Sequence, residues 1–455
     1  MFTTKRPLQC RASAEFHSSV RQLKLSIVAP ISASLLPVLK QTLPPPGILE
    51  QVCEFIFISA SEVSSIVYLI LILLVPILLA PIFVGAQTVS ELARSNYVGD
   101  DACRPCHDAI TSSYRLTAHH KTSKVANRES IAGSFAQGKN RLKTSDKDLQ
   151  FRMDAKKDGF YQTAVFFQPP DQKLISQRMD FVVGSGGKGQ TYLYWKADRL
   201  FELPVSYWSS VAAWVNSPGY TDGTADFQRP VVPRCLECHS SYFQKLPGEL
   251  PENHYSKQGF VLGISCERCH GPGQPHVQAE RAHLESAVNR RIVNPGKLGR
   301  ERQIEVCAQC HGGTGEELLP AFSFVPGEPL ARFINLHSPE INAKVDVHGN
   351  QVALLQRSRC YQISGTMTCG TCHNSHEPEK VAASYTEKCL TCHQPENCGL
   401  FPKLGAKLAE DCVDCHMPVQ ESEAIASTVG GRQVKDLIRT HWIKVYSEQV
   451  SPAER

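Results

Sequence analysis

The chain has 455 residues and a formal charge of +4, because 48 lysines and arginines nearly balance 44 aspartates and glutamates. This balance argues against a general nucleic-acid-binding surface. A content of 42% hydrophobic and 20% charged residues argues against wholesale disorder and against a protein that crosses a membrane many times. The length suggests two or three domains of about 100–200 residues each, and the 18 cysteines and 17 histidines decide the interpretation.

The first 86 residues have the pattern of an export signal preceded by an extension. Residues 1–65 lack a clear periodicity and contain the breaker cluster PPPG at 44–47, so we hypothesise that the true translation start lies further downstream. Residues 66–86 are apolar and end in VGA, which is typical of a signal peptide cleaved after Ala86; an uncleaved membrane anchor is the alternative. In both cases we expect the rest of the chain outside the cytoplasm, in the periplasm.

Residues 87–130 introduce a motif that recurs along the chain. Cys103 and Cys106 stand three positions apart, and His107 follows at once. This C-x-x-C-H pattern is typical of covalent haem c attachment, in which two thiols add to the vinyl groups at one edge of the macrocycle and the histidine ligates the iron. We therefore predict a first haem segment at 87–130, with a helix between this motif and His119.

The interval 131–230 contains no such motif and has the pattern of a β-rich domain. The runs LQFRMDA, FYQTAVFF, ISQRMDFVVG and TYLYWK are rich in β-branched and aromatic residues, and turn-forming residues separate them. The pattern predicts a β-meander over about 149–204. The glycine-rich run at 184–189 lacks the spacing of a phosphate-binding loop and is predicted to be a hairpin loop.

Residues 231–455 carry six further copies of the motif. The cysteines predicted to bind haem are Cys103, Cys106, Cys235, Cys238, Cys266, Cys269, Cys307, Cys310, Cys369, Cys372, Cys389, Cys392, Cys412 and Cys415, and the predicted near-side iron ligands are His107, His239, His270, His311, His373, His393 and His416. Zinc sites and disulfide frameworks also use paired cysteines, but neither requires a histidine directly after the second one. We predict seven covalent haems c, with a mainly α-helical and irregular six-haem domain at 231–455 organised around them.

Nine histidines outside the motifs follow the apolar run. Each six-coordinate iron needs a second axial ligand on the face of the haem opposite the motif histidine, here called the far-side ligand, so seven irons need seven. The histidines predicted to be far-side ligands are His119, His276, His348, His376 and His441, and the sequence leaves open the roles of His120, His254, His283 and His337. Methionine is scarce after the leader, so histidine–methionine ligation should be rare and the haems mainly of low potential. The surplus Cys360 and Cys398 could pair with each other or remain free.

These segments resemble the multihaem c-type cytochromes of bacteria, and more narrowly the haem domain of the tetrahaem cytochrome that serves hydroxylamine oxidoreductase. The carrying segments are YVGDDACRPCH with TAHH downstream, GISCERCHGPGQPH, VCAQCHGG, MTCGTCHNSH and CVDCHMP, within residues 97–120 and 230–445. The resemblance implies electron transfer through stacked haems ligated mostly by histidine pairs. It also implies far-side roles for His119, His276 and His376. Seven motifs and the β-rich insertion depart from the tetrahaem pattern.

We expect an extracytoplasmic electron-transfer protein that exchanges electrons with quinol- or cytochrome-linked redox proteins and binds no nucleic acid. The alternative is a haem c oxidoreductase that acts on a small nitrogen or sulfur compound, which requires one iron with an open coordination position. A structural haem module in a larger assembly is the third hypothesis. The sequence leaves the catalytic residues unknown, and a membrane tether at the N-terminus depends on whether the apolar run is cleaved.

Overall fold

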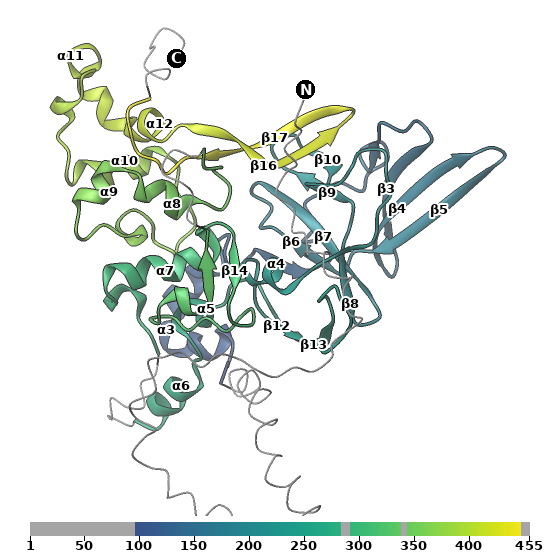
Figure 1. The fold of residues 1–455 in the computed structure, drawn as a ribbon, viewed down its shortest axis with the longest axis horizontal. Helices are drawn as coiled ribbons and strands as arrows, with labels where there is room; N and C mark the ends of the chain where they lie inside the picture. Colours follow the sequence, from purple (N-terminus) through teal and green to yellow (C-terminus); the bar gives the residue numbers. More distant parts are fainter. Residues whose placement is uncertain (1–95, 284–291, 338–343, 447–455) are drawn as a thin grey trace, which may run out of the picture. The chain divides into compact units, whose positions relative to one another are not determined.

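The structure is a computed structural model that describes residues 96–283, 292–337 and 344–446 (Figure 1). The N-terminal extension and the apolar run at 66–86 lie outside these residues. Within them, no helix is long and apolar enough to cross a membrane. The division of the chain at 130 and 230 remains a prediction.

Helix α3 (Asp100–Tyr114) opens the described chain and carries the first motif. Asp100 and Asp101 occupy its first turn, where carboxylates interact favourably with the helix dipole. The backbone leaves helical geometry at His107, directly after the second cysteine. The predicted helix beyond this motif is therefore present, but it ends at Tyr114, before His119.

The strands that follow form two antiparallel sheets. One has the order β2-β3-β4-β5: Arg141–Lys143, Leu149–Lys156, Gly159–Gln168 and Asp171–Arg178. The other joins β1, β6, β7, β8 and β11 in that order, with β9 on β7 and β10 on β9: Ser123–Val125, Phe181–Val183, Gly189–Lys196, Arg199–Glu202, Arg229–Pro230, Val205–Trp208 and Ala213–Asn216. The strands and the 184–189 hairpin loop confirm the β-meander prediction, except that the chain changes sheet between β5 and β6.

A shared apolar core involves residues from both sheets. Phe151, Tyr192 and Trp214 are fully or almost fully buried in it. Strand β3 alternates buried and less buried positions over Leu149–Asp154, as expected for a strand with one face on a core.

Replacing Phe151 with alanine is expected to lower the free energy of unfolding by about 3–5 kcal/mol, because the deletion leaves a cavity in a packed core. Leu174→Ala on β5 is the control: that side chain is 53% exposed, and its truncation should change stability by about 0.5 kcal/mol or less. Urea unfolding followed by circular dichroism measures both. Equal losses would contradict the core assignment.

The chain beyond residue 231 alternates short helices with hairpins. The helical segments are α4 Pro233–Glu237, α5 Cys266–His270, α6 Gln274–Arg281, η3 Pro295–Lys297, α7 Arg300–His311, η4 Leu330–Arg332, α8 Gln351–Gln356, α9 Arg359–Ile363, η5 Cys369–Thr371, α10 Ala383–Leu390, η6 Pro395–Asn397, α11 Phe401–Leu404, η7 Gly405–Glu410 and α12 Cys412–His416. The hairpins are β12–β13 (Ser240–Lys245, Tyr255–Leu262), β14–β15 (Gly315–Glu317, Ile334–Leu336) and β16–β17 (Val419–Val429, Arg432–Arg439).

The prediction of a mainly helical and irregular domain is therefore correct only in part. The hairpin β16–β17 turns through Gly430 and Gly431, which both have positive φ, a conformation that two-residue hairpin loops require and glycine adopts freely. The hairpin reaches strand β10 of the β-rich part (Figure 1), where the Ser427 hydroxyl donates to the Asn216 carbonyl. This hydrogen bond connects the C-terminal hairpin to the β-rich part.

Candidate haem sites

A cavity of about 4830 Å³ brings all seven motifs together. Every motif cysteine and every motif histidine lines it. Pockets for one small molecule usually measure about 300–1,000 Å³, so this cavity has room for several large ligands.

Short helical turns present the motif side chains. Cysteines three positions apart lie on one face of a helical turn, as on α5 and α12, which consist of the motif residues themselves. His270 Nδ1 lies 2.8 Å from the Val293 carbonyl oxygen and His416 Nδ1 lies 2.9 Å from the Lys444 carbonyl oxygen. A carbonyl can only accept, so each Nδ1 carries the proton and each Nε2 is left free to ligate a metal.

Three motif histidines stand beside a second histidine from a distant part of the chain. The ring centroids are 6.2 Å apart for His119 and His311, 5.9 Å for His270 and His376, and 6.0 Å for His373 and His441. Two imidazole nitrogens bonded at about 2 Å on opposite sides of one metal ion lie about 4 Å apart, which places the ring centroids about 6 Å apart. All three spacings fit an iron between the rings.

The angle between the ring planes separates these pairs. It is 80° for His119 and His311, but 26° for His270 and His376 and 28° for His373 and His441. An imidazole bound to iron can rotate about the iron–nitrogen bond, so two rings on one iron can have any angle between their planes. All three angles are therefore compatible with two histidines on one iron. They distinguish the fourth motif from the third and the fifth.

The six remaining histidines outside the motifs, of which only His276 and His348 are predicted ligands, divide into two groups. His276, His283, His337 and His348 line the cavity. His348 also lies near enough to His239 to lower its pKa further, after burial. His120 and His254 are not among the residues that line the cavity, and they pair with carboxylates instead: His120 Nε2 lies 3.5 Å from Asp100 Oδ2, and His254 Nδ1 lies 2.8 Å from Asp198 Oδ2.

Burial favours the neutral form of seven histidines that line the cavity. It lowers the pKa of His239, His311 and His441 to about 4, and it also lowers the pKa of four others: His119, His348, His373 and His376. Neutral imidazole is the form that ligates metals. These side chains therefore have the protonation state that iron ligation requires.

Cysteines of different motifs lie close together across the cavity. Three pairs are close enough for one cysteine to change the pKa of the other: Cys103 with Cys266, Cys238 with Cys310, and Cys307 with Cys369. These pairs join the first motif to the third, the second to the fourth, and the fourth to the fifth. Cys360 and Cys398 also line the cavity, and neither forms a disulfide.

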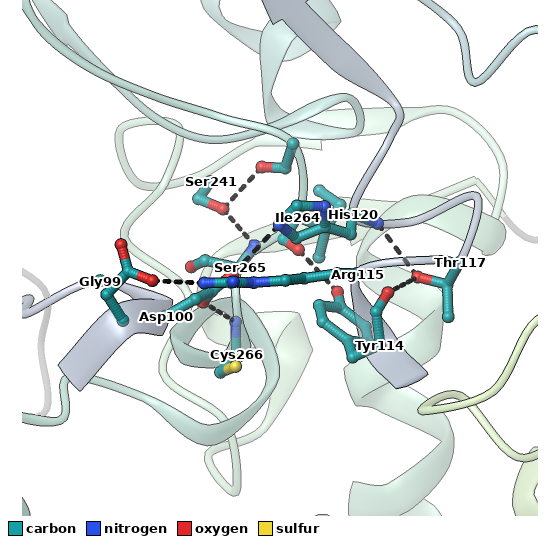
Figure 2. A network of polar contacts seen from close by, with 12 residues as sticks. Gly99, Asp100, Tyr114, Arg115, Thr117, His120, Ser241, Ile264, Ser265 and Cys266 are labelled. Carbon is teal, nitrogen blue, oxygen red and sulfur yellow. Dashed lines mark hydrogen bonds and ion pairs between the residues drawn. The ribbon is translucent and has the colours of Figure 1, made fainter. Parts of the chain in front are cut away.

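Hydrogen bonds hold the first and third motifs together (Figure 2). Asp100 Oδ1 accepts the backbone N–H of Cys266 at 2.9 Å, and the Tyr114 hydroxyl donates to the Ile264 carbonyl at 2.6 Å. The same network contains His120, whose backbone N–H donates to the Thr117 hydroxyl. Sequence analysis missed this network, because its members lie far apart along the chain.

The residues present fit covalent haem c. The cysteines supply pairs of thiols, and the cavity is wide enough for several macrocycles. Burial favours the neutral form of three motif histidines, and two others hold their Nδ1 proton on a carbonyl. Comparisons with known proteins agree. The Cytochrome c552 family model matches residues 220–313, a stretch that contains the second, third and fourth motifs.

Two curated relatives are multihaem cytochromes. The C-type polyheme cytochrome OmcC of Geobacter sulfurreducens is 24% identical over 164 residues, and the multiheme cytochrome MtrA of Shewanella baltica is 27% identical over 183 residues. The chain is similar to multihaem c-type cytochromes. Each match covers 35% of this chain, and the two matches cover 20% of OmcC and 51% of MtrA.

Among solved structures, the outer cell wall cytochrome OcwA aligns with 77% of this chain and 80% of its own chain, with 19% identity and a TM-score of 0.48. An undecaheme cytochrome from the S-layer of Carboxydothermus ferrireducens aligns with 77% of this chain and 52% of its own chain, with 17% identity and a TM-score of 0.37.

Proposed function

We propose that this chain carries seven covalent haems c and passes electrons between extracytoplasmic redox partners. The observation that carries the proposal is the cavity that all seven attachment motifs line together. Haem iron supplies one-electron redox chemistry. The chain contributes attachment, axial ligation, exclusion of water and the mutual placement of neighbouring sites.

Histidine pairs are proposed to hold four of the irons. The ring geometry supports His270 with His376, His311 with His119, and His373 with His441. The proximity of His348 to His239 supports the fourth pair. His276 remains a proposed far-side ligand on the wall of the cavity. Saturated irons suit electron transfer, because neither position is open to a substrate.

Contacts between motifs support an order of electron hopping. The three pairs of neighbouring cysteines bring motif one close to three, two close to four, and four close to five. Weaker electrostatic interactions of Cys307 with Cys269, and of Cys389 with Cys372 and Cys412, extend the series. The proposed path runs through motifs one, three, four, five, six and seven, with the second motif as a branch at the fourth.

Electron exchange with partners is proposed at the first and sixth motifs. Among the motif cysteines, Cys106 and Cys392 are the two exposed ones, whereas the other twelve are partly buried. A haem edge attached there lies closest to solvent and to a docking protein. We propose quinol- or cytochrome-linked proteins as the partners and the periplasm as the compartment.

The test is to produce the protein in a host that matures c-type cytochromes and to measure its mass and its electron paramagnetic resonance spectrum. We expect seven haems, and low-spin ferric signals of two kinds that reflect near-parallel and near-perpendicular imidazole planes. A mature chain without added haem would refute the proposal. A high-spin signal in the native protein would instead favour the oxidoreductase that acts on a small nitrogen or sulfur compound.

Matched cysteine variants test whether the number of bound haems depends on the motif cysteines. Replacing Cys369 and Cys372 with alanine should lower the haem count by one. Replacing Cys360, which lines the same cavity but belongs to no motif, should leave the count unchanged.

A further inference from the structure

Charged residues between the motif cysteines meet in a buried cluster. Glu237 lies between the cysteines of the second motif and Arg268 between those of the third. Arg268 Nη2 lies 3.2 Å from Glu237 Oε1, with 2% and 8% of the two side chains exposed. Arg234 Nη1 lies 2.5 Å from Glu237 Oε2. Two guanidinium groups and one carboxylate give this cluster a net charge of +1.

The cluster lies against the fourth motif. Arg234 Nη2 donates to the Gln309 carbonyl at 2.8 Å, and the Cys310 thiol lies 3.9 Å from the Glu237 carbonyl. Gln309 and Cys310 belong to the fourth motif, so the cluster stands beside its attachment edge. Arg268 Nε is buried and has no hydrogen-bond partner among the described residues.

Two carboxylates lie at the junction of the first and third motifs. The Glu267 carboxylate is buried and accepts backbone N–H groups from Val98, Gly99 and Gly273 at 2.8–2.9 Å. Asp100 lies at the same junction, where it accepts the backbone N–H of Cys266. Two carboxylates stand here, and the nearby His120 is kept neutral because burial lowers its pKa.

Buried charges act on reduction potentials because reduction adds one negative charge to a haem. A positive charge in a medium of low dielectric constant stabilises the reduced form, and a negative charge destabilises it. At an effective dielectric constant of about 20 and a separation of about 10 Å, one charge changes the ferrous-to-ferric equilibrium by about tenfold.

We propose that these charges give the relay a direction: the Arg234–Glu237–Arg268 cluster raises the reduction potential at the fourth motif above that at the first. Electrons that enter at α3 then move through the third motif and are held at the fourth, where the path branches. This inference rests on the proposed function, because it requires haems on these motifs. The three charged side chains are positioning residues that act through the field at the haem.

The experiment follows the near-perpendicular signal that is lost in His119→Gly, which assigns it to the fourth motif. The His119–His311 pair has ring planes 80° apart, whereas the His270–His376 and His373–His441 pairs are near-parallel. Near-perpendicular imidazole planes give a strongly anisotropic low-spin signal, which can be followed separately during a potentiometric titration of the whole holoprotein.

Three variants change the net charge of the cluster in a defined way. Arg268→Met makes it 0 and should lower the midpoint potential of this signal by about 59 mV, a tenfold change for one electron. Glu237→Gln makes it +2 and should raise the midpoint by a similar amount. The double variant restores +1 and should return the midpoint close to that of the native protein. If these residues had only a structural role, the midpoint potentials of the three variants would not follow the net charge of the cluster.

Arg332→Met is the control, because Arg332 also pairs with a glutamate and lies over an aromatic ring, but is 63% exposed. Its midpoint should equal that of the native protein. An unchanged midpoint in Arg268→Met, or shifts in the same direction for both single variants, would overturn the inference. If Arg268→Met does not fold, the isosteric Glu237→Gln still decides the sign. Absence of the signal in native protein would instead count against the proposed function.

Discussion

Replacing Cys307 and Cys310 with alanine is expected to remove one haem and to lower the melting temperature by roughly 10 °C. The two cysteines lie in the last turns of α7, whose residue Ala308 packs in a core with Phe324 and Phe333. Loss of the macrocycle beside this helix leaves a cavity, and emptying a site of aromatic size costs about 3–5 kcal/mol. Mass spectrometry and a thermal melt measure the two effects.

The same replacement at Cys103 and Cys106 is the matched control. It also removes one haem, but Cys106 is exposed, and α3 is the first helix of the described residues. We expect a clearly smaller fall in melting temperature, and we expect the signal of the fourth motif to persist. Equal destabilisation by the two replacements would contradict a central position for the fourth motif.

The proposed attachment sites follow from the sequence alone, because thioether chemistry fixes the spacing of the five residues in each motif. The axial partners could not be predicted in the same way. His119 follows the first motif, yet its ring lies beside His311 of the fourth. Such a pairing depends on how segments far apart in the chain fold together, and spacing within one segment carries no information about it.

The hairpins and the charged cluster were missed for different reasons. The pair Gly430–Gly431 between β-prone runs is a hairpin signal that the sequence contains, and it was overlooked among the haem motifs. The sequence also shows that Glu237 and Arg268 stand between motif cysteines. It does not show that they form an ion pair, because a residue next to a cysteine can face a haem, another motif or solvent.

Replacing His119 with glycine is expected to convert one haem per molecule from low spin to high spin. The far-side ring at the fourth motif is then absent, and the iron there is left with an open position. The near-perpendicular low-spin signal should disappear, while the near-parallel signals of the third and fifth motifs remain. Electron paramagnetic resonance of the oxidised protein measures this directly, and added imidazole should restore the low-spin state by filling the vacated space.

His120→Gly is the control, because this neighbouring ring pairs with Asp100 and is not among the residues that line the cavity (Figure 2). It should leave every low-spin signal in place. A high-spin centre in His120→Gly but not in His119→Gly would show that the axial ligand is the other histidine. If only His119→Gly exposes an iron, catalysis at the fourth motif is excluded in the native protein. The oxidoreductase alternative would then require an open iron at a motif without a measured ring pair.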